Sequence, residues 1–300
     1  MPHAVQVAGG PTTHRQVLPA MRALLVVFTV LTTLAVVALF VLSEQTDQTF
    51  AWTIQPAATA AFLGAGYAAG TTLVLLSLRD RVWADSKVPV LTVLVFTVVT
   101  LAATLLHLDR FHFQPEFAGL PLVARAAAWF WTGVYVAIPV LMVVALALQA
   151  RAPGVDPPPR RPVPGPLRIA LAAEAAVLLV VGGSLFAAPS TGGRLWPWAL
   201  TPLTARVVAA WLIAFGAATA VAAVAGDLDR LRTSTIAYTV FGLLALVTVA
   251  RYPGAVAWDR PVTWAYVALS GAVLLTGALG WRRAARPDPA VPAPAAGRTL

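Results

Sequence analysis

The stretch ALLVVFTVLTTLAVVALFVL, residues 23–42, is the strongest indication of the fold class in this chain. It contains no charged side chain, and about 20 helical residues are enough to cross the hydrocarbon core of a bilayer. A segment inside lipid must satisfy its own backbone polar groups, which favours a helix. The apolar run is longer than that of a secretory signal and no clean small-residue cleavage site follows it, so it predicts a transmembrane helix.

Seven more apolar stretches of similar length follow, and none shows the alternation expected of barrel strands. The composition of the 300-residue chain agrees, because 59% of its residues are hydrophobic and 11% are charged. Soluble domains are about 25% charged. We therefore predict an all-α, polytopic integral membrane protein with eight spans, at residues 22–43, 58–78, 88–107, 126–149, 167–188, 205–225, 234–251 and 262–281.

The formal net charge of +9 is distributed unevenly along the predicted topology. When successive loops are assigned to opposite sides, 15 of the 21 Lys and Arg residues fall on the side of the two termini. The positive-inside rule then predicts a plasma (cytoplasmic) membrane protein with both termini in the cytoplasm. The excess charge predicts contact with anionic membrane lipid and no nucleic-acid partner.

Several kinds of chemistry have no signature in the sequence. The chain has no Cys, which excludes disulfides, thiolate metal sites and cysteine nucleophiles. It also has no G-x-x-x-x-G-K-[ST] phosphate loop, no H-E-x-x-H motif and no mid-membrane His pair. We therefore expect no cofactor and no metal, and the sequence does not predict an oligomeric state.

An internal repeat is indicated by short matches at long spacing. Residues 52–56 (WTIQP) precede the second span and residues 198–202 (WALTP), 146 positions later, precede the sixth. Residues 109–110 and 259–260, both Asp-Arg, follow the third and seventh spans. These matches predict two parallel four-helix repeats. The expected segments are a tail at 1–21, repeats at 22–149 and 167–283, a Pro-rich linker at 150–166 and a disordered tail at 284–300.

Most of the tryptophans fall at the predicted outer boundary, among them Trp52, Trp131 and Trp198, whereas Trp211 lies within a span. They fit either an aromatic belt at the headgroups or an aromatic groove for a lipid tail, an isoprenoid or another amphipathic ligand. Gln55 and Thr201 precede the prolines of the repeated motif and are candidate helix caps. Helix N-termini also attract anions, and Arg206 would strengthen the second of them.

Polar candidates lie in the segment after the third span and at one position within the membrane. His107, Asp109, His112 and Glu116 are residue types that bind metals or transfer protons, although their spacing matches no known metal motif. The alternative is solvated loop residues with Asp-Arg pairing. Glu174 is the single acidic residue well inside a predicted span, which makes it a candidate for proton or ion coupling.

Three hypotheses for function remain open. The first is a binding or transport module for a small or lipid-like molecule, with its site toward the outer leaflet. The second is a membrane enzyme acting on a lipid-linked substrate, which requires His107, Asp109, His112 and Glu116 to converge. The third is a non-catalytic partner subunit. The predicted ligand-binding residues are Trp52, Gln55, His107, Asp109, Arg110, His112, Trp131, Trp198, Arg206, Asp259 and Arg260.

Overall fold

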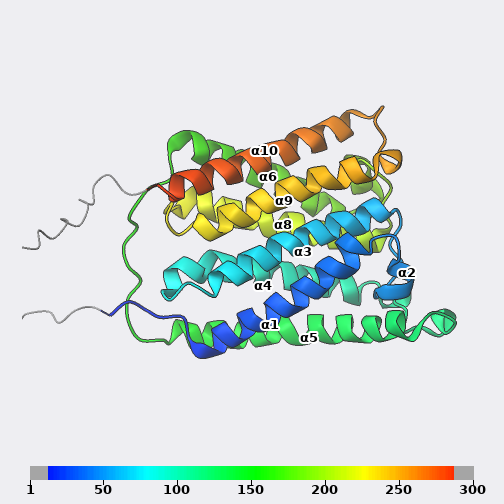
Figure 1. The fold of residues 1–300 in the computed structure, drawn as a ribbon, viewed down its shortest axis with the longest axis horizontal. Coiled ribbons are helices and arrows are strands. Elements are labelled where there is room, and N and C mark those ends of the chain that lie inside the picture. The colour runs from blue at the N-terminus through cyan, green and yellow to red at the C-terminus, as the bar shows by residue number, and fades with distance from the viewer. Residues whose placement is uncertain (1–12, 287–300) are drawn as a thin grey trace, which may run out of the picture.

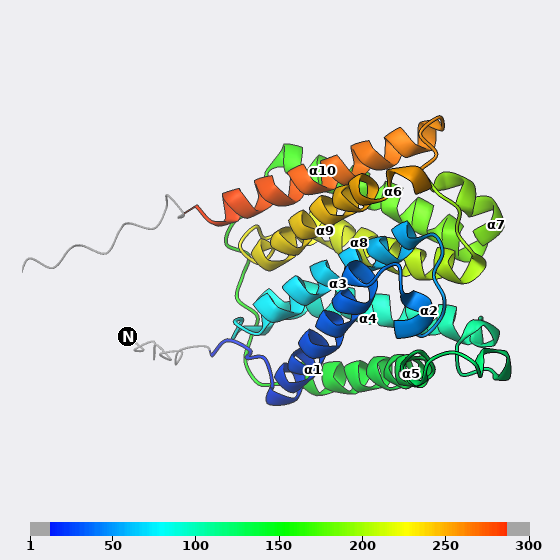
Figure 2. The same ribbon diagram turned by 45° about the vertical axis from the view of Figure 1, so that its right-hand side comes forward.

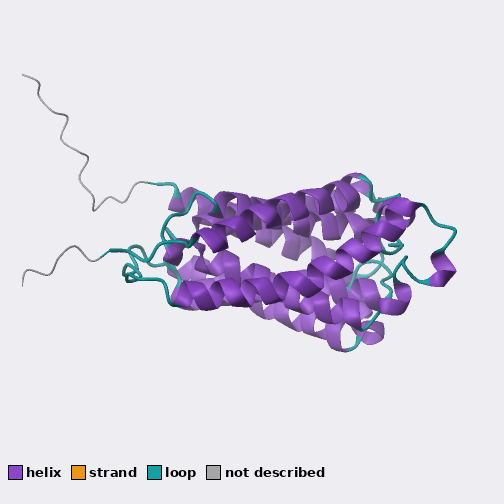
Figure 3. Cartoon of the chain, turned by 90° about the horizontal axis from the view of Figure 1, so that it is seen from below, coloured by secondary structure: helices purple, strands orange, loops and turns teal. Residues whose placement is uncertain are grey.

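The computed structural model describes residues 13–286, which form a bundle of helices that run along one common axis, with loops at its two ends (Figure 3). Within this range there is no strand, only three isolated bridges. Eight helices of the described chain are long and apolar enough to span a membrane, which confirms the predicted all-α fold with eight helices of spanning length. They are α1 (Pro19–Val36) with its π-helical continuation η1 (Val37–Val41), α3 (Ala57–Ser77), α4 (Trp83–Leu105), α5 (Leu122–Ala150), α6 (Gly165–Ala187), α8 (Pro202–Ala225), α9 (Arg232–Arg251) and α10 (Pro261–Ala284).

Short helices occupy the connections at the end of the bundle away from the first and last described residues (Figures 1 and 2). Their small size keeps the spanning helices close to their neighbours in sequence. They are α2 (Thr46–Thr49), η2 (Leu108–Arg110), η3 (Pro115–Phe117), α7 (Pro189–Gly192), η4 (Gly193–Leu195) and η5 (Pro253–Ala255).

The spanning helices pack as two parallel rows. In one row α1 packs on α3, α3 on α9 and α9 on α10. In the other, α5 packs on α4, α4 on α8 and α8 on α6. The chain thus places its first four spanning helices in the lower half of Figure 1 and its last four in the upper half, with α3, α4, α8 and α9 along the join.

Small residues explain why α3 lies at the centre of the bundle. A Cβ on Gly66 would lie 2.6 Å from the indole ring of Trp211 in α8, and one on Gly64 would lie 2.5 Å from the backbone nitrogen of Phe40 in η1. Glycine at both positions therefore allows a helix backbone to approach a ring on one side and another backbone on the other.

The helix ends differ from the predicted bounds by a few residues. α4 begins at Trp83, five residues before the predicted start, and its first turn contains Asp85. Thr201 caps α8 through a capping box with Thr204, as expected, whereas Gln55 caps nothing and Pro56 is the N-cap of α3.

The segment before α1 is held in place by other parts of the chain. Residues 13–18 form isolated bridges with the linker at Val155 and with Val82. The buried side chain of Gln149 accepts a hydrogen bond from the backbone N–H of Leu18 and donates one to the carbonyl of Gln16. α1 begins at Pro19, inside the predicted tail. Residues 1–12 of that tail and residues 287–300 of the predicted C-terminal tail lie outside the described residues.

Candidate functional site

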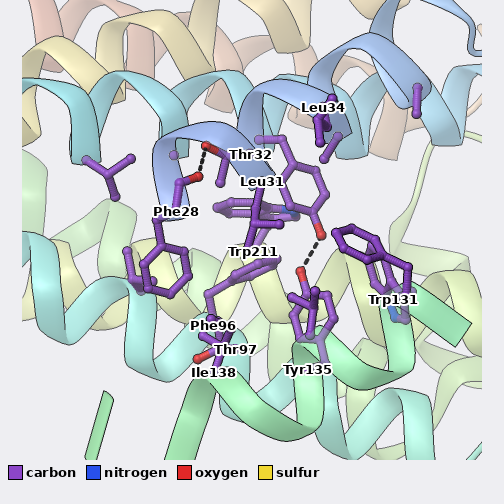
Figure 4. Close-up of a pocket in the computed structure, with 18 of the residues that line it drawn as sticks. Phe28, Leu31, Thr32, Leu34, Phe96, Thr97, Trp131, Tyr135, Ile138 and Trp211 are labelled. Carbon is purple, nitrogen blue, oxygen red and sulfur yellow. Dashed lines mark hydrogen bonds between the residues drawn. The ribbon is translucent and has the colours of Figure 1, made fainter. Parts of the chain in front are cut away.

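A cavity of about 310 Å³ lies among α1, α3, α4, α5 and α8 (Figure 4). It extends along these helices from Leu73 and Val74, in the half of the bundle nearer residues 13 and 286, through the middle of the bundle to α2 and the start of α5 at the opposite end. Its lining is almost wholly apolar and rich in rings. The lining residues are Phe28, Leu31, Thr32, Leu34, Ala35, Ala38, Thr49, Phe50, Tyr67, Gly70, Leu73, Val74, Thr92, Val93, Phe96, Thr97, Ala127, Phe130, Trp131, Val134, Tyr135, Ile138, Trp211 and Phe215.

The cavity opens sideways, between α1 and α5. Leu34 of α1 and Phe130 of α5 both line it, and each keeps 55% of its surface exposed. Because both residues lie within helices of spanning length, this opening faces the region that lipid would occupy. An apolar molecule dissolved in a bilayer therefore has a direct route into the bundle.

Aromatic rings form the inner wall of the cavity. The rings of Phe96 and Trp211 are stacked, with centroids 3.7 Å apart, and Phe215 lies 5.5 Å beyond Trp211. Trp211 comes from the second half of the chain, so the cavity of the first half is completed by α8. Such close packing fixes the wall, because neither ring can rotate without displacing the other.

Two hydroxyl groups meet inside this apolar lining. Tyr67 of α3 and Tyr135 of α5 are both buried, and their hydroxyls form a hydrogen bond with each other, drawn as a dashed line beside Tyr135 in Figure 4. Neither hydroxyl has another hydrogen-bond partner among the described residues. The sequence does not predict a site role for these two tyrosines or for Phe96, because nothing in it indicates that positions 67 and 135 come together.

Two of the predicted tryptophans close the loop end of this cavity. Trp52 packs against Trp131 with ring centroids 5.0 Å apart, and the Trp131 indole donates a hydrogen bond of 3.1 Å to Thr104. Phe50 and Phe111 pack on Trp52 from either side. Of the eleven predicted ligand-binding residues, Trp131 is the one that lines the cavity, and Trp52 supports it.

A second apolar cavity, of about 210 Å³, lies among α6, α8, α9 and α10. Trp196 and Tyr266 line it, and the predicted Trp198 packs on both of them. The Trp198 indole donates a hydrogen bond of 2.9 Å to Thr59 of α3. Trp52 and Trp198, paired in the predicted repeat, thus each pack beside a different cavity.

The tryptophans of this end divide into two groups. Trp52, Trp131, Trp196 and Trp198 are buried within the bundle, as a groove lining requires. A second set is exposed, as a headgroup belt requires, and consists of Trp129, Trp258 and Trp264.

His107 and Arg206 form a contact between the two halves. The Arg206 guanidinium lies 2.7 Å from Nε2 of His107 and also donates a hydrogen bond of 3.0 Å to the carbonyl of Phe186. Burial, and secondarily the positive charge of Arg206, lowers the pKa of His107. Neutral His107 therefore accepts from Arg206, which makes this pair a structural link between α4 and α8.

The other polar candidates of the same segment do not join His107. His112 is fully buried, and its ring nitrogens bond to the carbonyl of Phe50 and the hydroxyl of Thr53, at 2.9 and 3.0 Å. Burial lowers its pKa. Asp109 and Arg110 form an exposed ion pair of 3.0 Å, and Glu116 is exposed.

The convergence that a catalytic centre would need is therefore missing in this segment. Within residues 13–286, moreover, no three His, Asp or Glu side chains form a group that could hold a metal ion.

The remaining candidates lie apart from the cavities. Gln55 is exposed, and Arg260 donates hydrogen bonds to the carbonyls of Trp196 and Arg194, which holds the loop before α8. Asp259 is exposed beside it. The eleven predicted residues thus contribute to several separate features, and the structure does not bring them together as one site.

Glu174 is buried among α6, α9 and α10. Tyr238 donates a hydrogen bond of 3.0 Å to its Oε2, and Thr276 donates one of 2.7 Å to its Oε1. No Lys, Arg or His pairs with it among the described residues. Tyr238 and Thr276 also line a small cavity of about 40 Å³, as does Ser234, whose buried hydroxyl has no partner within the described chain.

A charged cleft of about 380 Å³ lies at the other end of the bundle, where the α3–α4 and α8–α9 loops meet the linker. Its acidic and basic side chains are equal in number, and Asp227 accepts hydrogen bonds from the backbone of Arg160 and Arg161. This cleft therefore ties the linker to the bundle. Its charged residues are Arg79, Asp80, Asp85, Arg160, Asp227, Asp229, Arg230 and Arg232.

Comparisons of the chain with protein-family models, with curated proteins and with solved structures found no match. The class of protein therefore rests on the fold and the cavities. An all-helical bundle with eight apolar helices of spanning length is the fold expected of a multi-pass membrane protein.

Proposed function

We propose that this protein binds a lipid-like molecule in the cavity among α1, α3, α4, α5 and α8, and takes it up from the surrounding bilayer. The observation that carries this proposal is the combination of an aromatic, apolar lining with an opening between two spanning helices. Ligand sites are concave, mostly apolar and equipped with a few placed polar groups. The Tyr67–Tyr135 pair supplies those groups here.

Several features support an orientation in which the cavity lies toward the outer leaflet. The loops at the end that carries residues 13 and 286 are rich in Arg, so the positive-inside rule assigns that end to the cytoplasm. The cavity reaches the opposite end of the bundle at α2 and the start of α5. In this orientation both termini are cytoplasmic, the membrane is the plasma membrane, and the partners are membrane lipids.

Two related halves fit the arrangement of the helices. α1 packs on α3 and α6 on α8, whereas α3 packs on α9 and α8 on α4 between the halves, which is the pairing a two-fold axis along the bundle would produce.

Transport would be an extension of binding, and it needs a group that couples to an ion or a proton. Glu174 is our candidate for that role, because it is a buried carboxylate with two hydrogen-bond donors and no cationic partner among the described residues. Replacing Glu174 with Gln tests this role. A flux of labelled lipid whose pH dependence is the same in wild type and Glu174→Gln would exclude proton coupling.

Binding is tested with a phospholipid that carries a diazirine near the middle of one acyl chain, reconstituted with the protein in nanodiscs. Ala35→Phe places a ring in the cavity, and the matched control Val30→Phe adds the same ring at a position of the same helix that is 56% exposed. We expect cross-links on α1 and α5 around Leu34 and Phe130 that Ala35→Phe reduces and Val30→Phe does not. Equal cross-linking in all three proteins would reject the proposal.

A further inference from the structure

The Tyr67–Tyr135 pair indicates what chemistry the bound molecule carries. Two phenol hydroxyls hold two protons, and their mutual hydrogen bond uses one of them. Each hydroxyl has the other as its partner, and no carbonyl, carboxylate or further hydroxyl in the described chain accepts the second proton. One donor of this tyrosine pair is therefore left over.

That leftover donor lies in the cavity and not on the surface. Tyr67 of α3 and Tyr135 of α5 are 3% and 5% exposed, and both line the cavity. Buried hydroxyls almost always find an acceptor, because leaving one unpaired is costly. The molecule that fills the cavity is the natural source of that acceptor.

The rest of the lining offers little competition for this role. Thr32, Thr92 and Thr97 also line the cavity, but each hydroxyl donates to a carbonyl within its own helix. The Trp131 indole is bonded to Thr104. The indole nitrogen of Trp211, which also lines the cavity, is buried and has no partner among the described residues, so it is a further donor available to a ligand. The polar content of the ligand must therefore be small.

From this arrangement we infer that the cavity selects a lipophile that carries a hydrogen-bond-accepting oxygen, such as a carbonyl, flanked by apolar chain. Tyr67 and Tyr135 are its specificity-determining residues. The acceptor oxygen bonds to the free phenol proton, and the chain on either side contacts the aliphatic and aromatic wall. A pure hydrocarbon fits the same space but leaves the donor unpaired. This inference rests on the proposed function, because it concerns the same cavity.

The test compares two probes of equal chain length, the ketone 7-tridecanone and the alkane tridecane. Their equilibrium partition between detergent micelles with and without the purified protein is measured by gas chromatography. We expect the wild type to bind the ketone about 2- to 10-fold more tightly than the alkane, relative to empty micelles, since one net hydrogen bond is at stake.

The double variant Tyr67→Phe/Tyr135→Phe should bind both probes equally and should keep the wild-type affinity for the alkane, which also shows that the cavity is intact. Tyr266→Phe is the matched control. That tyrosine lines the second cavity and donates to the carbonyl of Ala245, so the ketone preference should persist.

The possible results separate the two proposals. If the wild type binds ketone and alkane equally well, the inference about the acceptor is wrong while binding of lipophiles stands. If the ketone preference survives in the double variant, the tyrosines do not determine it and the inference is also wrong. If neither probe binds the wild type, the proposed function itself fails.

Discussion

Tyr238 of α9 donates a hydrogen bond of 3.0 Å to Glu174 of α6, and this bond crosses between two spanning helices. Thr276 of α10 bonds to the other oxygen of the same carboxyl group. Three helices of the second half are thus joined around one buried acidic side chain. The hydrogen bonds replace the solvation that a carboxyl group loses inside a bundle.

Removing either donor should destabilise the second half. We expect Tyr238→Phe and Thr276→Val each to lower the free energy of unfolding by about 1–3 kcal/mol, because each leaves an oxygen of Glu174 unpaired. Thermal unfolding in detergent measures the effect. Thr239→Val is the control, since the Thr239 hydroxyl bonds to a carbonyl of its own helix. Unfolding of all three variants at the wild-type temperature would contradict the expected role of the carboxyl group.

Gly66→Ala should disrupt the join between the halves. The added Cβ would meet the indole of Trp211, which cannot move away because Phe96 is stacked on it at 3.7 Å. Overpacking of this kind costs about 1–3 kcal/mol. Gly183→Ala in α6 is the control, because no atom lies within 4 Å of a Cβ at that position. The two variants should differ in melting temperature, and equal values would show that the Trp211 contact is loose.

The spans could be predicted from the sequence, but their arrangement could not. Continuous apolar runs identify each helix, since every residue that contacts lipid must be apolar. The same rule hides the interior. α3, with its glycines, is the least hydropathic of the eight spanning helices and the most buried, whereas α1 is the most hydropathic and among the least buried. α10, however, has a mean hydropathy of 1.7 and is as little buried as α1, so hydropathy does not identify which helices form the core.

The cavity depends on contacts between residues far apart in sequence. Tyr67 and Tyr135 belong to different helices, and no periodicity links them. Trp211 stands out as a tryptophan within a span, and Gly66 as a small residue, but only the fold shows that one packs on the other. The sequence predicts His107 and His112 as site residues because histidine can bind ligands and transfer protons. In the structure both form hydrogen bonds that hold loops and helices together.

Single cysteines can test the orientation, because the native chain has none and any label reports one position. Gly119 lies in the loop before α5, with no atom within 4 Å of a Cβ there, and Arg79 is exposed at the opposite end of the bundle. In intact cells a membrane-impermeant maleimide should label Gly119→Cys, and should label Arg79→Cys only after permeabilisation. The reverse pattern would invert the proposed topology.

Acid should weaken the contact between α4 and α8. The folded pKa of His107 is lowered by burial and by Arg206, so the unfolded chain binds the proton more readily. Stability contributed by this group therefore falls as the pH drops through the usual range of a histidine. The Gln side chain of His107→Gln stays neutral and can accept a hydrogen bond from Arg206. The melting temperature of this variant should therefore fall less between pH 7.5 and pH 5 than that of the wild type. Because the pKa of His112 is lowered as well, the difference between the two proteins, rather than the wild-type curve alone, tests His107.

The stability that Asp80 contributes should depend on pH in the opposite direction to that of His107. It lies in the α3–α4 loop at the charged cleft, where burial and then the neighbouring Asp85 raise its pKa from 3.8 to about 6. Because the folded pKa is raised, its contribution to stability is complete below the unfolded pKa and is lost as the pH rises through about 6. Asp80→Asn cannot ionise, so we expect it to melt at a higher temperature than the wild type at pH 7.5.

That difference should shrink as the pH falls and vanish near pH 4, where Asp80 of the wild type is protonated in the folded protein. Asp109→Asn is the matched control, because its carboxylate is 66% exposed in a surface pair and its removal should leave the melting curve nearly unchanged. A stabilisation by Asp80→Asn that is equal at pH 4 and pH 7.5 would mean that the charge of Asp80 is not its cause.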